Sequence, residues 1–187
     1  KLGFIGIQRE KVTKDHLIFL EKTAQTALEQ TLNKLPIAKM MHYQVQQKNG
    51  ALADVQFARP AHRIIALHGM NILHVSCLGI DASNQTEGHR FLAPGLLTIA
   101  HAEQYEAELE AKAKVIPSFD KRRAQITAAL LKAAGEDLVL MPDSLLDEVT
   151  SLVEWPAVYE CHFDQEFLEV PQECLILTMQ TNQKYFA

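Results

Sequence analysis

The strongest constraint on the fold is an amphipathic stretch that begins directly after Pro142. Its apolar residues recur at the three- and four-residue spacing of one helical face: Leu145, Leu146, Val149, Leu152 and Val153. Asp143 or Ser144 is placed to cap the helix, and the Trp155-Pro156 pair ends it. The pattern predicts a helix with one buried face, so other elements have to cover that face.

Four more helices are predicted. Residues 14–35 have Thr13 as a cap, Pro36 as a stop, and one apolar stripe: Leu17, Leu20, Ala24, Leu28, Leu32 and Leu35. Residues 102–114 are rich in Ala, Glu and Lys and place Tyr105, Leu109 and Ala113 on one face of an exposed helix. After Pro117, Ser118 caps a helix that runs to a stop at Gly135. The last helix opens at residues 170–173, with proline at its first position.

Strands are predicted between the helices, without a regular alternation. Residues 55–80 are rich in β-branched side chains and contain a turn at residues 68–71, which favours a hairpin. Residues 157–163 are a further predicted strand. We therefore expect an α+β fold, with a mixed or antiparallel sheet and several amphipathic helices. Residues 1–13 are expected to form a tail or short strand, and residues 14–187 a single domain.

Composition limits the function classes. Lys and Arg total 18 against 23 Asp and Glu, so the net charge of -5 argues against bulk coating of nucleic acid and leaves local contacts. The three cysteines are far apart, which favours reduced core thiols in the cytoplasm over a disulfide framework. No apolar run reaches the roughly 20 residues of a membrane helix, and we expect no membrane contact. Because the chain begins at Lys1 and stops after an aromatic pair, we expect a piece of a longer protein.

Metal and nucleophile patterns are weak. His62, His68 and His74 recur every six residues, but the turn at Gly69 interrupts their face and no other ligand completes the set. Cys161 and His162 are adjacent, so in a strand they would point to opposite faces. We expect a core thiol, ordinary histidines, no metal site and no catalytic residue.

Residues 88–91, Gly-His-Arg-Phe, form the most unusual segment, which we call the GHRF loop. Arg90 can bind phosphate, and His89 or Phe91 can stack on an unpaired base, as a single-stranded nucleic acid requires. The alternative is structural: Arg90 satisfies buried carbonyl groups and Phe91 lies in the core. The net acidic charge favours the structural alternative, and both are kept.

Seven segments, in this order along the chain, resemble the beta subunit of the bacterial two-subunit glycyl-tRNA synthetase. The longest is DSLLDEVTSLVEWP at 143–156. The others are KLPI (34–37), FARPAH (57–62), GHRF (88–91), KVI (114–116), FLEVP (167–171) and QKYF (183–186). An ordered set of this kind is far more specific than one short motif. Departures at Ala38, Tyr43 and Ser118 affect a turn, an aromatic packing site and a helix cap.

The resemblance implies part of an enzyme that uses ATP to activate glycine and then transfers it to tRNA(Gly). In this family the catalytic alpha subunit is a separate chain, so ATP and magnesium are expected there and no cofactor here. This segment would be an amino-proximal, accessory-type domain with three partners: the alpha subunit, tRNA(Gly) and the remainder of the beta subunit. It would either dock and brace those chains or contact the tRNA acceptor end through Arg59, His89, Arg90 and Phe91. An editing-like hydrolase comes third, and the isolated segment is predicted to be inactive.

Overall fold

The computed structural model describes residues 14–47 and 50–187, with the side chains of residues 14–16 left out. The chain forms two compact units. The first unit contains residues 1–86 and 98–104, and the second contains residues 87–97 and 105–187. The predicted tail at 1–13 and its cap Thr13 lie outside the described residues. The single domain over 14–187 stays a prediction, and each unit is described by itself.

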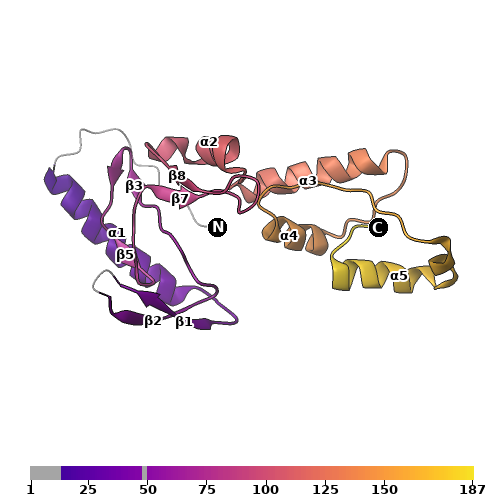
Figure 1. Cartoon of the computed structure of the whole chain (residues 1–187), viewed down its shortest axis with the longest axis horizontal. Helices are drawn as coiled ribbons and strands as arrows, with labels where there is room; N and C mark the ends of the chain where they lie inside the picture. The colour runs from indigo at the N-terminus through magenta and orange to yellow at the C-terminus, as the bar shows by residue number, and fades with distance from the viewer. Residues whose placement is uncertain (1–13, 48–49) are drawn as a thin grey trace. The chain divides into compact units, whose positions relative to one another are not determined.

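The first unit is built on α1 (Lys14–Lys34) and a hairpin (Figure 1). The predicted apolar stripe of α1 is confirmed, since its members from Leu17 to Leu32 are all partly buried while the opposite face is exposed. Strands β1 (Met41–Gln46) and β2 (Leu52–Phe57) pair antiparallel over their whole length, with Met41 opposite Phe57. The sequence analysis missed β1.

Short strands complete the first unit. The hairpin expected around residues 68–71 is confirmed by β3 (Leu67–His68) and β4 (Asn71–Ile72), with Gly69 at a φ of 59° in the turn. A second hairpin joins β5 (Ser76–Cys77) to β6 (Ile80–Asp81). Strands β7 (Gln85–Glu87) and β8 (Leu96–Thr98) form another two-stranded sheet, where the chain passes from one unit to the other.

Side chains of α1 attach the helix to the short strands. The Gln25 side chain donates to the Ser76 carbonyl at 2.9 Å and accepts from the Ser76 backbone N–H at 2.8 Å. Glu21 Oε1 accepts from the His74 backbone N–H at 2.9 Å and lies 2.7 Å from His74 Nδ1. The backbone hydrogen bond from His74, followed by its side-chain hydrogen bond, lowers the pKa of Glu21. The strand edge is therefore fixed to α1 by polar side chains as well as by the apolar stripe.

Helices dominate the second unit. Following η1 (Ala102–Gln104) of the first unit, α2 (Tyr105–Glu108) passes into η2 (Leu109–Ala113), a π-helical turn that ends at left-handed Lys114. Helix α3 (Phe119–Ala134) has the predicted cap and stop, because Ser118 Oγ accepts from the Lys121 N–H at 3.3 Å and Gly135 has a φ of 60°. Next come α4 (Asp143–Leu152), η3 (Gln165–Glu169), α5 (Gln172–Thr178) and η4 (Met179–Gln183).

The core of the second unit lies between α3 and α4. Ile126 and Leu130 of α3 pack with Leu146 of α4, and a ring of partly buried residues surrounds them: Met141, Val149, Val153, Val158 and Phe186. Burial of these side chains is the main stabilising contribution, since each fully buried aliphatic side chain is worth roughly 1.5–3 kcal/mol. The α+β class is confirmed, with small two-stranded sheets in place of one larger sheet.

Helix α4 corrects two details of the prediction. Pro142 occupies the cap position, and no side chain caps the helix; Asp143 is its first residue and accepts from Arg123 Nη2 at 2.7 Å. Leu152 is 67% exposed, whereas Thr150 is fully buried. Thr150 is buried without cost because its hydroxyl donates to the Leu146 carbonyl at 2.6 Å.

Three other predictions are wrong. Residues 157–163 form no strand, because no neighbouring strand pairs with them in the part of the chain that the structure describes. Cys161 and Cys174 are exposed and not core thiols, whereas Cys77 is partly buried. Proline does not occupy the first position of α5, since Pro171 is its cap residue. Within residues 14–47 and 50–187, every helix is too short or too polar to cross a membrane.

Candidate nucleic-acid interface

The backbone of the GHRF loop is held by hydrogen bonds on both sides. The His89 N–H donates to the Ala113 carbonyl at 2.7 Å, and the Ala93 N–H donates to the His89 carbonyl at 3.0 Å. The Gly88 N–H donates to the Gly95 carbonyl at 3.3 Å. The loop is thus attached to the end of η2 and closed on itself.

The His89 side chain organises the tip of the loop. Its Nδ1 accepts from the Phe91 N–H at 3.3 Å and from the Leu92 N–H at 3.2 Å. In the neutral ring the proton is therefore assigned to Nε2. Since His89 is partly buried and satisfies two backbone donors, it supports the loop and does not project from it.

Gly88 is required by the close approach of other backbone atoms. A Cβ at this position would lie 2.3 Å from the Ala93 carbonyl oxygen. It would also lie 3.1 Å from both Cα and the carbonyl oxygen of Ala113. Because these are backbone atoms, a larger residue would have to displace the loop or the end of η2.

Arg90 and Phe91 point outward from this base. Arg90 is exposed, and among the described residues it has no hydrogen-bond or ion-pair partner. Phe91 is 81% exposed, and its ring centroid lies 6.3 Å from that of His89. Within the described chain Arg90 thus satisfies no carbonyl group and Phe91 lies outside the core, while the loop satisfies polar groups through its backbone and His89.

A hollow of about 240 Å³ lies beside the loop within the second unit. Its lining comes from both arms of the loop and from η2: Gly88, Ala93, Pro94, Gly95, Leu96, Leu97, Lys112 and Ala113. Lys112 is its one cationic side chain, and Glu108 pairs with that ammonium at 2.5 Å. The one cation of the hollow is therefore already paired, whereas Arg90 is the cation of the loop that has no carboxylate partner in the described chain.

Arg59 belongs to the other unit. It follows β2 and is exposed, and its Nη1 lies 3.5 Å from Met41 Sδ. The segment after it is fixed to β1, because the Ala61 N–H donates to Tyr43 Oη at 3.3 Å. The structure thus brings His89, Arg90 and Phe91 together in one loop and places Arg59 on a separate element of the first unit.

Comparison with known proteins decides the family. The family model described as glycyl-tRNA synthetase beta subunit matches residues 10–187. This chain belongs to that family.

Relatives agree with the assignment. The chain is similar to the glycine–tRNA ligase beta subunits of Ralstonia nicotianae (56% identity, 87% of this chain and 23% of the relative) and Neisseria meningitidis (46%, 89% and 24%). It is also 43% identical to that of Nitrosomonas eutropha, where all of this chain matches 28% of the relative. The chain thus spans about a quarter of the length of these beta subunits.

A different arginine of this glycyl-tRNA synthetase beta subunit segment has the structural role first considered for Arg90. Arg122 on α3 donates from Nη1 to the carbonyls of Ile116 at 2.5 Å and Pro117 at 3.1 Å. Its Nε donates to the Thr150 carbonyl at 3.2 Å. Sequence reasoning missed Arg122 because its acceptors are backbone atoms of distant segments, which leave no residue pattern.

Other residues considered for chemistry in this family segment have ordinary surroundings. His62 is exposed, and His74 forms the contact with Glu21 described above. Residues able to bind a metal do not gather in groups of three within the described chain. Burial raises the pKa of the Cys77 thiol, which disfavours its nucleophilic form at neutral pH.

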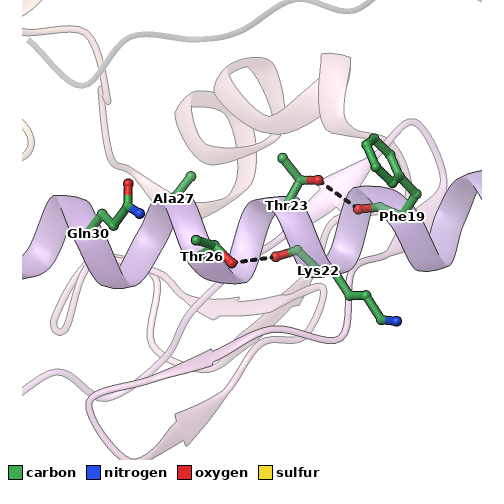
Figure 2. Close-up of a pocket in the computed structure, with 6 residues that line it drawn as sticks. All are labelled: Phe19, Lys22, Thr23, Thr26, Ala27 and Gln30. Carbon is green, nitrogen blue, oxygen red and sulfur yellow. Dashed lines mark hydrogen bonds between the residues drawn. The ribbon is translucent and has the colours of Figure 1, made fainter.

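A second depression, of about 460 Å³, lies on α1 and is lined by that helix alone (Figure 2). All six lining residues are exposed: Phe19, Lys22, Thr23, Thr26, Ala27 and Gln30. The hydroxyl of Thr23 donates to the Phe19 carbonyl at 2.9 Å, and that of Thr26 to the Lys22 carbonyl at 3.0 Å. Because the hydroxyl groups are satisfied within the helix and no second element of residues 14–47 and 50–187 lines it, the described depression lacks the converging groups of a ligand site.

Proposed function

We propose that this chain is a non-catalytic part of a glycine–tRNA ligase, acting in the cytoplasm, and that its GHRF loop contacts the unpaired acceptor end of tRNA(Gly). The names of the similar beta subunits support the enzyme class. Glycine activation with ATP and magnesium would take place on the alpha subunit. The role of this segment would be to hold the tRNA and the other chains in position.

One observation carries the tRNA contact: a fixed loop exposes an arginine without a partner and an aromatic ring. A base stacked on an aromatic side chain contributes roughly 1–3 kcal/mol, and the ring of Phe91 is open to such a base. Arg90 beside it can bind the phosphate of the same nucleotide. Because His89 and Gly88 already fix the backbone, little conformational entropy is lost on binding.

Architecture and docking of the alpha subunit form the second candidate. It is supported by exposed apolar side chains towards the carboxyl end of the second unit: Tyr159, Phe163, Phe167, Leu168, Leu177 and Tyr185. Such a set is typical of a protein-binding surface. The two roles are compatible, since they use different residues. An editing-like activity is the third candidate, and no observation favours it.

The test uses the reconstituted alpha-beta enzyme with Arg90→Ala and Phe91→Ala. Both residues are exposed, so the melting temperature of each variant should stay within a degree or two of wild type. Loss of the phosphate contact should weaken tRNA binding and make the salt dependence of log Kd shallower by about 0.7–0.9 for Arg90→Ala. Loss of stacking should weaken binding roughly 5- to 150-fold for Phe91→Ala, with an unchanged salt slope.

Phe19→Ala is the matched control, because Phe19 is also an exposed aromatic residue, at 67% exposure, and belongs neither to the loop nor to the residues suggested for docking of the alpha subunit. It should leave tRNA binding unchanged. If Arg90→Ala and Phe91→Ala bind tRNA like wild type but associate more weakly with the alpha subunit, the loop is a docking element and the tRNA contact is refuted. Glycine-dependent pyrophosphate exchange by the isolated chain would refute the non-catalytic role.

A further inference from the structure

Basic residues are concentrated in one part of this acidic chain. Between residues 30 and 80 the sequence has five Lys and Arg but a single acidic residue, Asp54. Among the described residues the first unit has six Lys and Arg against six Asp and Glu, whereas the second unit has eight against sixteen. The described part of the first unit therefore carries no net charge, and the second unit carries -8. The net charge of the second unit repels an anion at long range, and that of the described first unit does not.

Three of these cations gather at the open end of the β1–β2 hairpin: Lys34, Lys39 and Arg59, which we call the basic cluster. Met41 pairs with Phe57, so Lys39, two residues before Met41, and Arg59, two residues after Phe57, flank the same end. Lys34 is the last residue of α1 and precedes Lys39 by five residues, a span of at most about 17 Å. The fold thus places the three side chains within reach of one extended ligand.

None of the three charges is neutralised by the described part of the protein. All three side chains are exposed, and Lys34 and Lys39 have no partner among the described residues. Arg59 has only Met41 Sδ within hydrogen-bonding distance. Asp54 lies three residue pairs beyond the Met41–Phe57 pair, about 10 Å along the hairpin from it, and accepts from Gln44 Nε2 at 3.1 Å. The three cations are unpaired within the described chain, and the only nearby carboxylate of the hairpin, that of Asp54, is bonded to Gln44 instead. This arrangement favours binding of an anion from outside the chain.

The surroundings fit a polynucleotide better than a single ion. Met40 and Met41 are 46% and 39% exposed between Lys39 and the strand, so they offer apolar surface to a sugar or base. The hydrogen bond from the Ala61 N–H to Tyr43 Oη fixes the backbone two residues after Arg59. Spaced cations with an intervening apolar surface are typical of a site that follows a phosphate backbone.

We propose that the basic cluster binds the phosphate backbone of RNA, as a contact separate from the GHRF loop. With the proposed function as its basis, the RNA is the tRNA substrate of the ligase. The cluster would supply most of the salt-dependent affinity of this segment, because its three cations are unpaired. The GHRF loop would supply stacking and one phosphate contact.

The experiment compares two double variants of the complete alpha-beta enzyme, each with two fewer positive charges. Lys39→Gln/Arg59→Gln alters the basic cluster, and Lys22→Gln/Lys132→Gln alters exposed lysines outside it. tRNA binding is titrated against salt. The cluster variant should lose about 1.4–1.8 from the slope of log Kd against log salt, and roughly tenfold in affinity for each phosphate contact at 0.1 M salt. The control variant should keep the wild-type slope.

Each result decides the proposal. Equal salt slopes of tRNA binding for the two double variants overturn it. It is also overturned if the basic-cluster variant keeps the wild-type slope for tRNA but associates more weakly with the alpha subunit in a salt-dependent way, which would identify an acidic protein as the partner. Arg59→Lys keeps the positive charge, so its slope of log Kd against log salt should stay close to that of wild type. This result would show that the loss in the double variant comes from charge and not from altered folding. If only the GHRF-loop variants bind tRNA like wild type, the loop contact is refuted and the basic-cluster proposal is kept. If only the basic-cluster variant binds tRNA like wild type, the basic-cluster proposal is refuted and the loop contact is kept.

Discussion

Arg122 and Arg123 are neighbours on α3, and the structure predicts opposite costs for replacing them. Arg122 donates to three backbone carbonyls, of which those of Ile116 and Thr150 belong to buried residues. Arg123 donates to the carboxylates of Asp147 and Asp143, both at 2.7 Å. These bonds are shorter than two of the three made by Arg122. Bond length and charge would therefore rank Arg123 as the more important residue.

Burial of the acceptors reverses that ranking. A carbonyl left without a donor in a buried place costs about 1–3 kcal/mol, and the three carbonyls of Arg122 share one donor group, so we expect Arg122→Ala to cost about 2–4 kcal/mol. The carboxylates bound by Arg123 are 90% and 54% exposed, and water can replace the arginine there. Exposed ion pairs contribute 0–1 kcal/mol, so we expect Arg123→Ala to cost about 1 kcal/mol or less.

Urea unfolding and thermal melting of the 187-residue chain, both followed by circular dichroism, measure the free energy of unfolding and the melting temperature of each variant. Arg122→Ala should lower the melting temperature by roughly 5–15 °C, and Arg123→Ala by about 4 °C at most. Arg122→Lys should recover only part of the loss, because one ammonium cannot replace the planar set of donors. Equal costs for the two alanine variants, or a larger cost at Arg123, would show that acceptor burial does not control these interactions.

Three other variants test the core, the strand attachment and the loop. Leu146→Ala should cost about 2–5 kcal/mol in urea unfolding, and a cost no larger than that of exposed Leu152→Ala would contradict the assigned core. Glu21 has a lowered pKa when folded, so its stabilisation is complete above its ordinary pKa of 4.5 and is lost as the pH falls through the lowered value. Glu21→Gln should remove this part of the acid-unfolding profile, and superimposable profiles would refute it. Gly88→Ala should cost about 1–3 kcal/mol and weaken tRNA binding, whereas Gly135→Ala, with open space around its Cβ, should cost about 1 kcal/mol and leave binding intact.

Sequence periodicity predicted the helices well because it records burial directly. The stripe of α1 and the cap and stop of α3 depend on local spacing and on single residues such as Ser118 and Gly135. Strands were predicted less well because a strand needs a partner that local composition does not specify. Residues 157–163 have a β-like composition without a neighbouring strand, whereas β1, which contains three polar residues, pairs along its whole length with β2.

The GHRF loop shows which part of a site a sequence can predict. Its composition indicated an irregular segment with a cation and an aromatic residue, and this was confirmed. The division of roles was not predictable, because it depends on the folded geometry of the loop: the His89 ring accepts from the Phe91 and Leu92 N–H groups, and the His89 N–H donates to the Ala113 carbonyl. The total charge also gave no information on location, since it averaged a first unit whose described residues are neutral and a second unit of -8.

In the two proposed contacts, RNA binding is divided between the exposed side chains of a fixed loop and a cluster of unpaired cations. The second unit, with a charge of -8, repels a phosphate backbone at long range, so Arg90 and Phe91 can act only at short range on a nucleotide that is already close. The basic cluster lies on the unit whose described residues carry no net charge, so its unpaired cations would attract the same backbone without that repulsion. Salt screens the attraction between the basic cluster and the phosphate backbone far more than it weakens stacking of a base on Phe91. A ligase of this family should therefore lose tRNA affinity in high salt mainly through the basic cluster, while the discrimination of unpaired bases by the loop persists.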